Sequence, residues 1–389
     1  MRVLQLALAV LAATGGVADA ACAAGSTRAT RASAPRTVRM LEPSLAVLEY
    51  KKEGHSYWRW DASGEPGGSR VHYLVSGPEG ARPLVLVHGF GASWFHWRYN
   101  VPFLATKYRV YAVDMIGFGL SDKPLLQYSS ELWANQLAAF IEEVVVPSAP
   151  CKVAIAGNSL GGFACLGAAV LCPELIEGVA LLNAAGQFKP LAKMEAMAPA
   201  DEEAGALGVW AAEFQQRFAT LAQRAVLFAS FTFTKQPARI KQVLGSVYSH
   251  DASNVDDALV ESIAQAATHP NAAEVFYRIV SKTASSKVYL DDLLAELAPA
   301  TELLLLWGES DPWIRPATAD RIQRLRPAAR RVSVDAGHCP HDEAPAACNS
   351  ALGAWVDGLA GAPLVVPAEP MVVAARWSTR REAGPALAR

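Results

Sequence analysis

The stretch Val153-Ala154-Ile155-Ala156-Gly157-Asn158-Ser159-Leu160-Gly161-Gly162 decides the fold that this sequence predicts. The apolar run from Lys152 to Ala156 predicts a buried strand, and the Ala-rich residues from Phe163 to Leu171 predict a helix. Between them, Gly157 to Gly161 fits the G-x-S-x-G pattern, in which a tight turn from strand to helix exposes a nucleophilic serine. The two glycines are required because side chains would not fit such a turn. The pattern also describes an ordinary Gly/Ser turn, so Ser159 is a candidate that needs catalytic partners.

Length and composition limit the class of protein. The chain has 389 residues, 52% of them hydrophobic, which is enough for one large α/β domain with an insertion or for two domains. The net charge of −2 provides no basic stripe for phosphates, so we expect no nucleic-acid partner. After the N-terminal segment there is no apolar run of about 18 residues, so we expect no stable membrane span in the mature protein. The cysteines lack zinc-type spacing, which predicts no metal site and favours buried thiols, although a disulfide stays open.

The N-terminus has the composition of a targeting sequence. Residues 1–20 combine Arg2, an apolar run and a small-residue stretch ending at Ala20, which predicts a secretory signal peptide. Residues 21–52 begin with a stretch that has arginine, serine and threonine but no acidic residue, and this is typical of a transit peptide. Together the two segments predict delivery to a plastid. The alternative is a disordered N-terminus of a secreted protein.

Apolar and alternating runs predict a mostly parallel, doubly wound α/β sheet. The first two strands, at 57–60 and 70–75, are expected to form an antiparallel lead-in. Besides the strand at 152–156, the remaining predicted strands are 83–87, 108–114, 178–183, 301–308 and 331–334. Helical spacing predicts helices at 132–146, 320–325 and 346–359. We expect the core to consist of residues 53–185 and 301–360, and we expect residues 361–389 to be a disordered tail.

The block from 186 to 300 interrupts this core. Its periodicity is helical, with Trp210, Phe214 and Phe218 spaced along one helical face. A connection of this length is usually a lid or a binding element, so we predict a helical cap that folds over Ser159. We expect the three aromatic residues, together with Trp94, to line an apolar acyl or isoprenoid channel. The alternative is that these rings only attach the cap to the core.

Candidate partners of Ser159 follow other predicted strands. Asp311 follows the strand at 301–308, and His338 follows the final strand. Ligands of such sheets bind at the carboxyl ends of the strands, so these side chains are expected to meet there. Asp114 also ends a strand, but we expect its carboxylate to accept amide hydrogen bonds from the glycine loop that follows. His341 is the alternative base, although it lies beyond Pro340, where the chain turns towards the last helix.

The loop after the strand at 83–87 is the predicted oxyanion site. Its sequence is His88-Gly89-Phe90-Gly91. The backbone amides of Phe90 and of Leu160, the residue after the nucleophile, are the expected oxyanion donors. We expect His88 to hydrogen-bond the loop in place and not to take part in catalysis.

From about Tyr57 to Leu359 the sequence resembles the α/β-hydrolase superfamily. It is most similar to plastid-type members from plants, algae and cyanobacteria that are related to pheophytinase. The motifs that carry the resemblance are His88-Gly89-Phe90-Gly91-Ala92-Ser93, His96-Trp97-Arg98, Gly157 to Gly162, Leu181-Leu182-Asn183, Asp311-Pro312-Trp313 and Gly337 to Glu343. The resemblance implies that Ser159 is the nucleophile, His338 the general base, Asp311 the orienting acid, and Phe90 and Leu160 the oxyanion donors. It also implies that the cap lies between strands 6 and 7.

The same resemblance implies the activity of a serine hydrolase. Its expected substrate is a small lipophilic carboxylic ester, cleaved through an acyl-enzyme without a cofactor. Three alternatives stay open because motifs do not separate them. They are a C–C bond hydrolase, a perhydrolase, and a ligand sensor with very slow turnover. The oligomeric state is not predicted.

Overall fold

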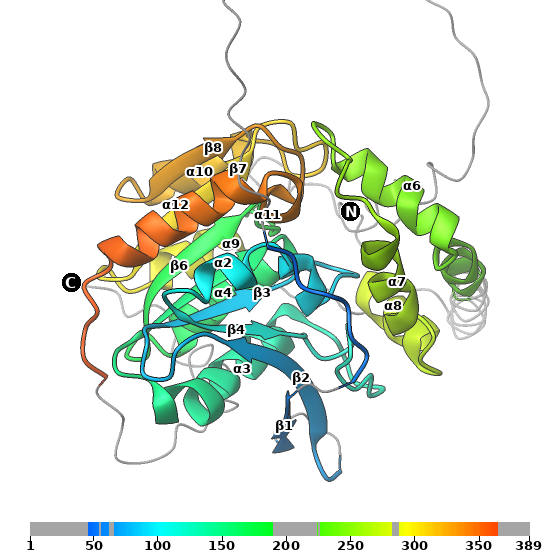
Figure 1. Ribbon diagram of the computed structural model, residues 1–389, viewed down its shortest axis with the longest axis horizontal. Coiled ribbons are helices and arrows are strands. Elements are labelled where there is room, and N and C mark those ends of the chain that lie inside the picture. Colours follow the sequence, from blue (N-terminus) through cyan, green and yellow to red (C-terminus); the bar gives the residue numbers. More distant parts are fainter. Residues whose placement is uncertain are drawn as a thin grey trace, which may run out of the picture.

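A computed structural model of the chain describes residues 46–53, 56–61, 66–189, 224, 226–281 and 288–364 (Figure 1). The predicted signal peptide and nearly all of the predicted transit-like segment and tail lie outside these residues. So do Trp210, Phe214 and Phe218.

The described chain builds an eight-stranded sheet with the order β1-β2-β4-β3-β5-β6-β7-β8. Its strands are β1 (Ser56–Trp60), β2 (Ser69–Ser76), β3 (Pro83–Val87), β4 (Arg109–Val113), β5 (Val153–Asn158), β6 (Ile176–Leu182), β7 (Glu302–Gly308) and β8 (Arg330–Val334). The β2 strand is antiparallel to β1 and β4, and all the other pairs are parallel. All eight predicted strands and the predicted fold class are therefore confirmed.

Successive residues of the central strands pack on opposite faces of the sheet. Val85 and Val87 of β3 belong to one buried cluster, and Leu84 and Leu86 belong to a second one. The first face is covered by α3 (Ser130–Phe140), α4 (Leu160–Leu171), α9 (Leu290–Glu296) and α10 (Ala317–Leu325). The second is covered by η2 (Trp94–Trp97), α2 (Val101–Leu104) and α12 (Pro345–Gly358). Because both faces are covered, β3, β5 and β6 are buried along their whole length.

The strand order places a topological switch point between β3 and β5. From β3 the chain continues to β4 on one side, whereas from β5 it continues to β6 on the other side. Loops leaving two such strands diverge to opposite faces and leave a crevice at their carboxyl ends. The predicted oxyanion loop follows β3, and Ser159 follows β5, so both border this crevice.

The segment between β6 and β7 is helical where it is described. It holds a helix at 226–234, followed by α6 (Pro237–Val247), α7 (Asp257–Ala266), α8 (Ala272–Val280) and α9. Figure 1 shows α6, α7 and α8 together at the side of the sheet to which the arrow of β3 points. In contrast, α9 packs in the core cluster through Leu290, Leu293 and Leu294. The described insertion thus leaves the sheet after β6 and returns to the core at α9.

Further helical segments follow α3 and β8 in the described chain. After α3 the helix continues as a π-helical turn (Ile141–Val145) and a 3-10 turn (Val146–Ser148). The short helix α11 (Pro340–Glu343) follows β8 and leads directly into α12. Because His338 precedes α11, the position of this short helix determines where that histidine lies.

Candidate active site

The turn at Ser159 has the strained backbone of a nucleophile elbow. Ser159 lies between the end of β5 and the start of α4, with φ 53° and ψ −117°. A non-glycine residue rarely adopts positive φ, and such strain concentrates at functional sites. A Cβ added to Gly157 would lie 2.4 Å from the carbonyl carbon of Gly161, and one added to Gly161 would lie 2.4 Å from the His88 oxygen. Both glycines are therefore required by close backbone approach, as the sequence predicts.

His338 and Asp311 form a buried hydrogen-bonded pair. The distance between His338 Nδ1 and Asp311 Oδ2 is 2.8 Å, and the two residues are 5% and 4% exposed. An ionised carboxylate only accepts hydrogen bonds, so Nδ1 carries the proton in this contact. The tautomer leaves Nε2 of His338 as a proton acceptor, which is the state that a general base needs.

Asp311 is held by three further donors. Its Oδ1 accepts hydrogen bonds from the backbone amides of Trp313 (2.7 Å) and Ile314 (3.0 Å), and its Oδ2 accepts one from Asn183 Nδ2 (2.7 Å). Burial alone would raise the pKa of Asp311. The hydrogen bond from His338, the electrostatic contribution of that ring and the two amides outweigh burial and hold this pKa below its ordinary value. Asp311 therefore stays ionised beside His338.

The loop that carries His338 contacts the elbow directly. Asn158, the residue before Ser159, donates its Nδ2 to the His338 carbonyl oxygen at 2.9 Å. Within the described residues no hydrogen bond joins Ser159 Oγ to the His338 ring. Catalytic hydrogen bonds are often long in the absence of substrate and tighten when it binds. The structure thus brings Ser159, His338 and Asp311 to neighbouring loops at one edge of the sheet.

The predicted oxyanion loop packs against the same turn. A Cβ on Gly89 would lie 2.9 Å from Asn158 Oδ1 and 3.3 Å from the Ser159 Cβ, so the oxyanion loop packs closely against the elbow at this position. Among the described residues, the backbone amides of Phe90 and Leu160 have no backbone carbonyl partner in the loops and turns. Leu160 is the first residue of α4, where an amide has no partner within the helix. Both amides are available to a ligand oxygen.

His88 and Asp114 have structural contacts. His88 Nδ1 lies 2.7 Å from the Gly89 oxygen, and its Nε2 accepts the Met115 amide at 3.1 Å. Asp114 is fully buried, and its carboxylate accepts the amides of Trp94 (2.7 Å) and Leu120 (2.8 Å). The expectation that Asp114 holds the glycine loop after its strand is confirmed, and His88 joins the oxyanion loop to that same region.

His341 lies in an apolar environment away from Asp311's contacts. Its ring packs against His96 and Trp97, with centroid distances of 4.7 and 4.2 Å, and neither ring nitrogen has a hydrogen-bond partner among the described residues. Burial lowers the pKa of His341 well below its ordinary value, so the ring is neutral. Of these two histidines, His338 is therefore the one that the structure joins to an acid.

Trp94 is the one predicted substrate-binding aromatic residue that lies within the described part of the chain. Trp94 is 2% exposed and packs in the core cluster beside Phe95, so its described contacts are those of a core residue. The sequence places Phe231 among the aromatic residues of the helical insertion but does not assign it to the site, and it does not single out Phe276. Phe276 of α8 lies 6.0 Å from the Phe90 ring and 5.4 Å from the Phe231 ring, measured between centroids. The described insertion thus reaches the oxyanion loop through aromatic rings.

Other kinds of site find no support in the described part of the chain. There, no group of three or more His, Cys, Asp or Glu residues could hold a metal ion. No helix among the described ranges has the length and apolar character needed to cross a membrane. The predicted buried thiols are present, because Cys151, Cys165, Cys172, Cys339 and Cys348 are free and buried.

Comparison with known proteins shows which family and which relatives this chain is similar to. Residues 84–351 match the profile of the Alpha/beta hydrolase family. The chain is 30% identical to the chloroplastic pheophytinase of Arabidopsis thaliana over 342 residues, which are 78% of this chain and 66% of that protein. It is 40% identical to 2-hydroxy-6-oxo-6-(2'-aminophenyl)hexa-2,4-dienoic acid hydrolase of Metapseudomonas resinovorans over 123 residues, 31% of this chain and 41% of that protein. The chain therefore spans less than two thirds of the length of either relative.

A solved structure is similar in fold. Naproxen esterase (carboxylesterase NP) from Bacillus subtilis matches with a TM-score of 0.55 and 23% identity, over 78% of this chain and 91% of that one. At this identity the likeness concerns the arrangement of strands and helices and not the chemistry.

Proposed function

This chain belongs to the alpha/beta hydrolase family, and on that premise we propose that it is a serine hydrolase that cleaves carboxylic esters. In this proposal Ser159 is the nucleophile, His338 the general base and Asp311 the acid that orients it. The amides of Phe90 and Leu160 hold the oxyanion. The natural substrate is a lipophilic ester with an acyl or isoprenoid-type chain.

The observation that carries the proposal is the pairing of His338 with Asp311 beside the strained elbow. The pair is buried, it fixes the tautomer that leaves Nε2 as an acceptor, and the His338 loop is bonded to Asn158 next to Ser159. Serine, histidine and aspartate follow β5, β8 and β7, and this placement on three loops at the same edge of the sheet supports the proposal that they act together in acyl transfer.

The proposed reaction has two steps. His338 Nε2 takes the proton of Ser159 Oγ while Oγ bonds to the ester carbonyl carbon, and the two amides stabilise the negative oxygen. The tetrahedral species then collapses, and the departing alcohol receives the proton from His338. Water then attacks the acyl carbon while giving a proton to His338, and the carboxylic acid is released as Ser159 Oγ leaves and recovers that proton from His338. Removing one oxyanion donor typically costs roughly 3 kcal/mol of barrier, so the Phe90 loop is part of the proposed catalytic machinery.

The proposal also includes a cellular location and an apolar substrate. We infer a plastid location from the predicted signal and transit-like segments, and the similarity to a chloroplastic relative supports it. Secretion is the alternative. The aromatic contact of Phe276 with Phe90 supports an apolar substrate.

Labelling with a fluorophosphonate tests the nucleophile. We expect the wild-type protein to be labelled covalently and Ser159→Ala to lose labelling while keeping its thermal unfolding temperature. Ser246→Ala, which removes an exposed hydroxyl from α6, is the matched control and should label like the wild type. Labelling of folded Ser159→Ala at the wild-type rate would remove Ser159 from the mechanism.

Steady-state hydrolysis of p-nitrophenyl esters then separates the alternative functions. Continuous turnover supports the esterase. A single burst equal to the enzyme concentration, without further turnover, would instead identify a ligand sensor. Labelling without any ester cleavage, combined with hydrolysis of a vinylogous β-diketone or peroxide-dependent oxidation, would favour the C–C hydrolase or the perhydrolase.

A further inference from the structure

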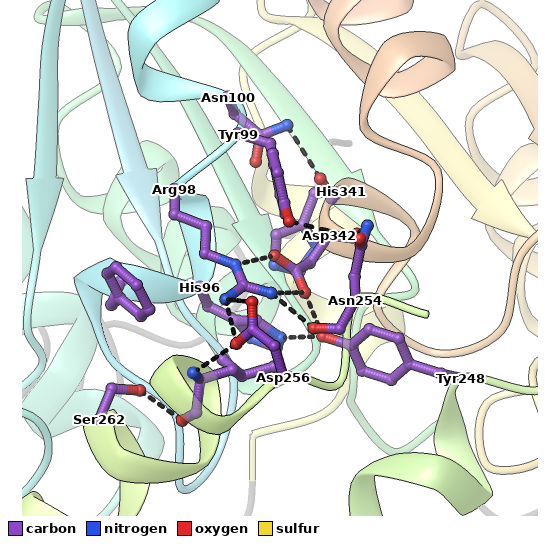
Figure 2. A network of polar contacts seen from close by, with 12 residues as sticks. His96, Arg98, Tyr99, Asn100, Tyr248, Asn254, Asp256, Ser262, His341 and Asp342 are labelled. Atoms are coloured by element: carbon purple, nitrogen blue, oxygen red, sulfur yellow. Dashed lines mark hydrogen bonds and ion pairs between the residues drawn. The ribbon is translucent and has the colours of Figure 1, made fainter. Parts of the chain in front are cut away.

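Arg98 is a buried cation at the end of η2, close behind the oxyanion loop in sequence. Its side chain is 1% exposed. Nε donates to Asp342 Oδ1 at 3.0 Å, Nη1 donates to both Asp256 oxygens at 2.7 and 2.9 Å, and Nη2 donates to the Asn254 carbonyl oxygen at 2.6 Å and to Asp342 Oδ2 at 3.3 Å. Together these contacts occupy all three nitrogens of the guanidinium. Figure 2 shows these contacts converging on Arg98 from two other segments of the chain.

Asp342 receives a second buried donor from the insertion. Tyr248, the residue after α6, donates its hydroxyl to Asp342 Oδ2 at 2.7 Å. His96 Nε2 lies 2.7 Å from the same hydroxyl, which therefore accepts a hydrogen bond from His96 while it donates to Asp342. Burial, with the nearby charge of Arg98, lowers the pKa of His96 to about 3, so its ring is neutral in this contact.

The link between α6 and α7 is also bonded to the loop that carries His338. The backbone amide of His338 itself donates to the Val247 oxygen at 2.9 Å. Glu343 Oε1 accepts the amides of His250 and Asp251 at 2.7 and 2.8 Å, and its Oε2 accepts the Gly337 amide at 2.5 Å. We call residues 247–256, together with Arg98 and residues 337–343, the clasp. The insertion is thereby joined to the peptide unit that presents the histidine.

A buried network of charges can serve stability or can fix the geometry of the segments that it joins. Desolvation usually cancels most of the attraction in a buried ion pair, so stability alone is a weak reason for one. Fixed geometry is a stronger reason, because Arg98, Asp256 and Asp342 are far apart in sequence and their contacts leave each segment one orientation. A shift of about 1 Å in a catalytic group can reduce a rate about a hundredfold.

We propose that Arg98, Tyr248 and Asp342 are positioning residues that hold the His338 loop in register with Ser159 and fix the α6–α7 link of the insertion beside it. This inference rests on the proposed function, because it assigns the clasp to the histidine that serves there as the base. It accounts for the His96-Trp97-Arg98 and His341-Asp342-Glu343 motifs, which the triad leaves without a role.

A matched pair of tyrosine variants tests the clasp. Tyr248→Phe removes the hydroxyl that joins His96 to Asp342. Tyr108→Phe removes the hydroxyl of another tyrosine with little exposure, which donates to Asp357 Oδ1 at 2.6 Å and to the Gly353 oxygen, both on α12. The rate of fluorophosphonate labelling reports the Ser159 and His338 geometry independently of ester structure. We expect Tyr248→Phe to slow labelling and kcat about tenfold at a temperature where the protein is folded, with KM changed less. Tyr108→Phe should keep the wild-type rate even if its unfolding temperature falls as much.

Asp256→Asn provides a second, milder variant should Tyr248→Phe fail to fold. The Asp256 side chain is 45% exposed, and asparagine can still cap α7, where Asp256 accepts the Leu259 amide at 2.8 Å. The Asp256→Asn change weakens the pairing with Arg98 and should therefore also slow labelling. Wild-type labelling rates in both folded variants would overturn the clasp while leaving the esterase intact. A wild-type protein that is never labelled would instead overturn the proposed function, so the two failures are distinguishable.

Discussion

Asn183 donates its side-chain amide to Asp311 Oδ2 at 2.7 Å, the same oxygen that accepts His338. Asn183 directly follows β6, is fully buried and has a φ of 45°, a conformation that asparagine tolerates better than most residues. Its Oδ1 accepts the Gly308 amide at 2.8 Å at the end of β7. One side chain therefore joins the ends of two strands and fixes the acid that orients the histidine.

We expect Asn183→Ala to lower kcat roughly 10- to 100-fold, because a hydrogen bond to a charged group contributes about 1.5 to 3 kcal/mol. The variant should also unfold at a lower temperature, since the Gly308 amide loses its partner. Gln136→Ala is the control, because Gln136 is equally buried and donates to the Asp114 carbonyl oxygen instead. It should lose stability and keep kcat. Equal kcat losses in the two variants would mean that Asn183 acts on stability alone.

Replacement of Asp311 by asparagine should be more damaging. The carboxamide can still contact His338, but it favours the tautomer with a proton on Nε2, and the loss in kcat should approach the roughly 10⁴-fold known for this change in serine proteases. Asp114→Asn should instead reduce stability, since Asp114 accepts the amides of Trp94 and Leu120. Steady-state kinetics on folded protein compare the two. A larger loss of kcat from Asp114→Asn would move the orienting role to Asp114.

His341→Phe should leave activity close to that of the wild type. Both ring nitrogens of His341 are buried without a partner in the described structure, and its neighbours are the rings of His96 and Trp97. Replacing an unpaired buried polar ring by an apolar ring of similar shape is neutral or stabilising, so the unfolding temperature should stay or rise. His338→Gln, in contrast, should abolish turnover. Loss of kcat in folded His341→Phe, with activity retained in His338→Gln, would exchange the two assignments.

The depressed pKa of Asp311 predicts a pH dependence of stability. The unfolded carboxyl has a pKa of about 3.9, so in acid the unfolded chain binds a proton that the native state does not yet bind. Asp311 therefore stabilises the fold fully above about pH 5, and this stabilisation is lost as the pH falls through the native pKa. We expect the difference in unfolding temperature between wild type and Asp311→Asn to shrink as the pH falls from about 5 towards 3. Asp257→Asn, whose side chain is 98% exposed in the wild type, should show no such trend.

Sequence alone predicts those parts of this fold that depend on local pattern. The central strands are apolar runs buried on both faces, and the elbow is a short motif with a steric reason for each glycine, so both follow from residue types alone. The contacts of Arg98, Tyr248 and Asn183 do not, because their partners lie on other strands and helices and no periodicity relates them. Trp94 was expected near the pocket from its proximity to the oxyanion loop. Yet η2 turns its ring into the core, which a linear distance cannot indicate.

The last prediction concerns the substrate, and it rests on aromatic rings that the structure describes. Trp210, Phe214 and Phe218 lie outside the described residues, so their role as channel residues stays a prediction. Phe231 and Phe276 extend from the insertion to Phe90, whose amide is the proposed oxyanion donor. If an acyl chain lies along these rings, each buried methylene should contribute about 0.8 kcal/mol, or close to fourfold in kcat/KM per carbon until the channel is filled.

Activity should then rise along p-nitrophenyl acetate, butyrate and octanoate, and Phe231→Ala should flatten this series more than it lowers acetate turnover. Phe233→Ala is the control on the same helix, because the Phe233 ring lies under the Arg239 guanidinium, 4.2 Å from it, instead of against Phe276. It should leave the slope of the series unchanged. A flat series in the wild type would indicate a small or polar substrate. An equal slope in the Phe231→Ala and Phe233→Ala variants would leave these rings the purely structural role of attaching the insertion to the sheet, because a chain that contacts neither ring cannot gain from their presence.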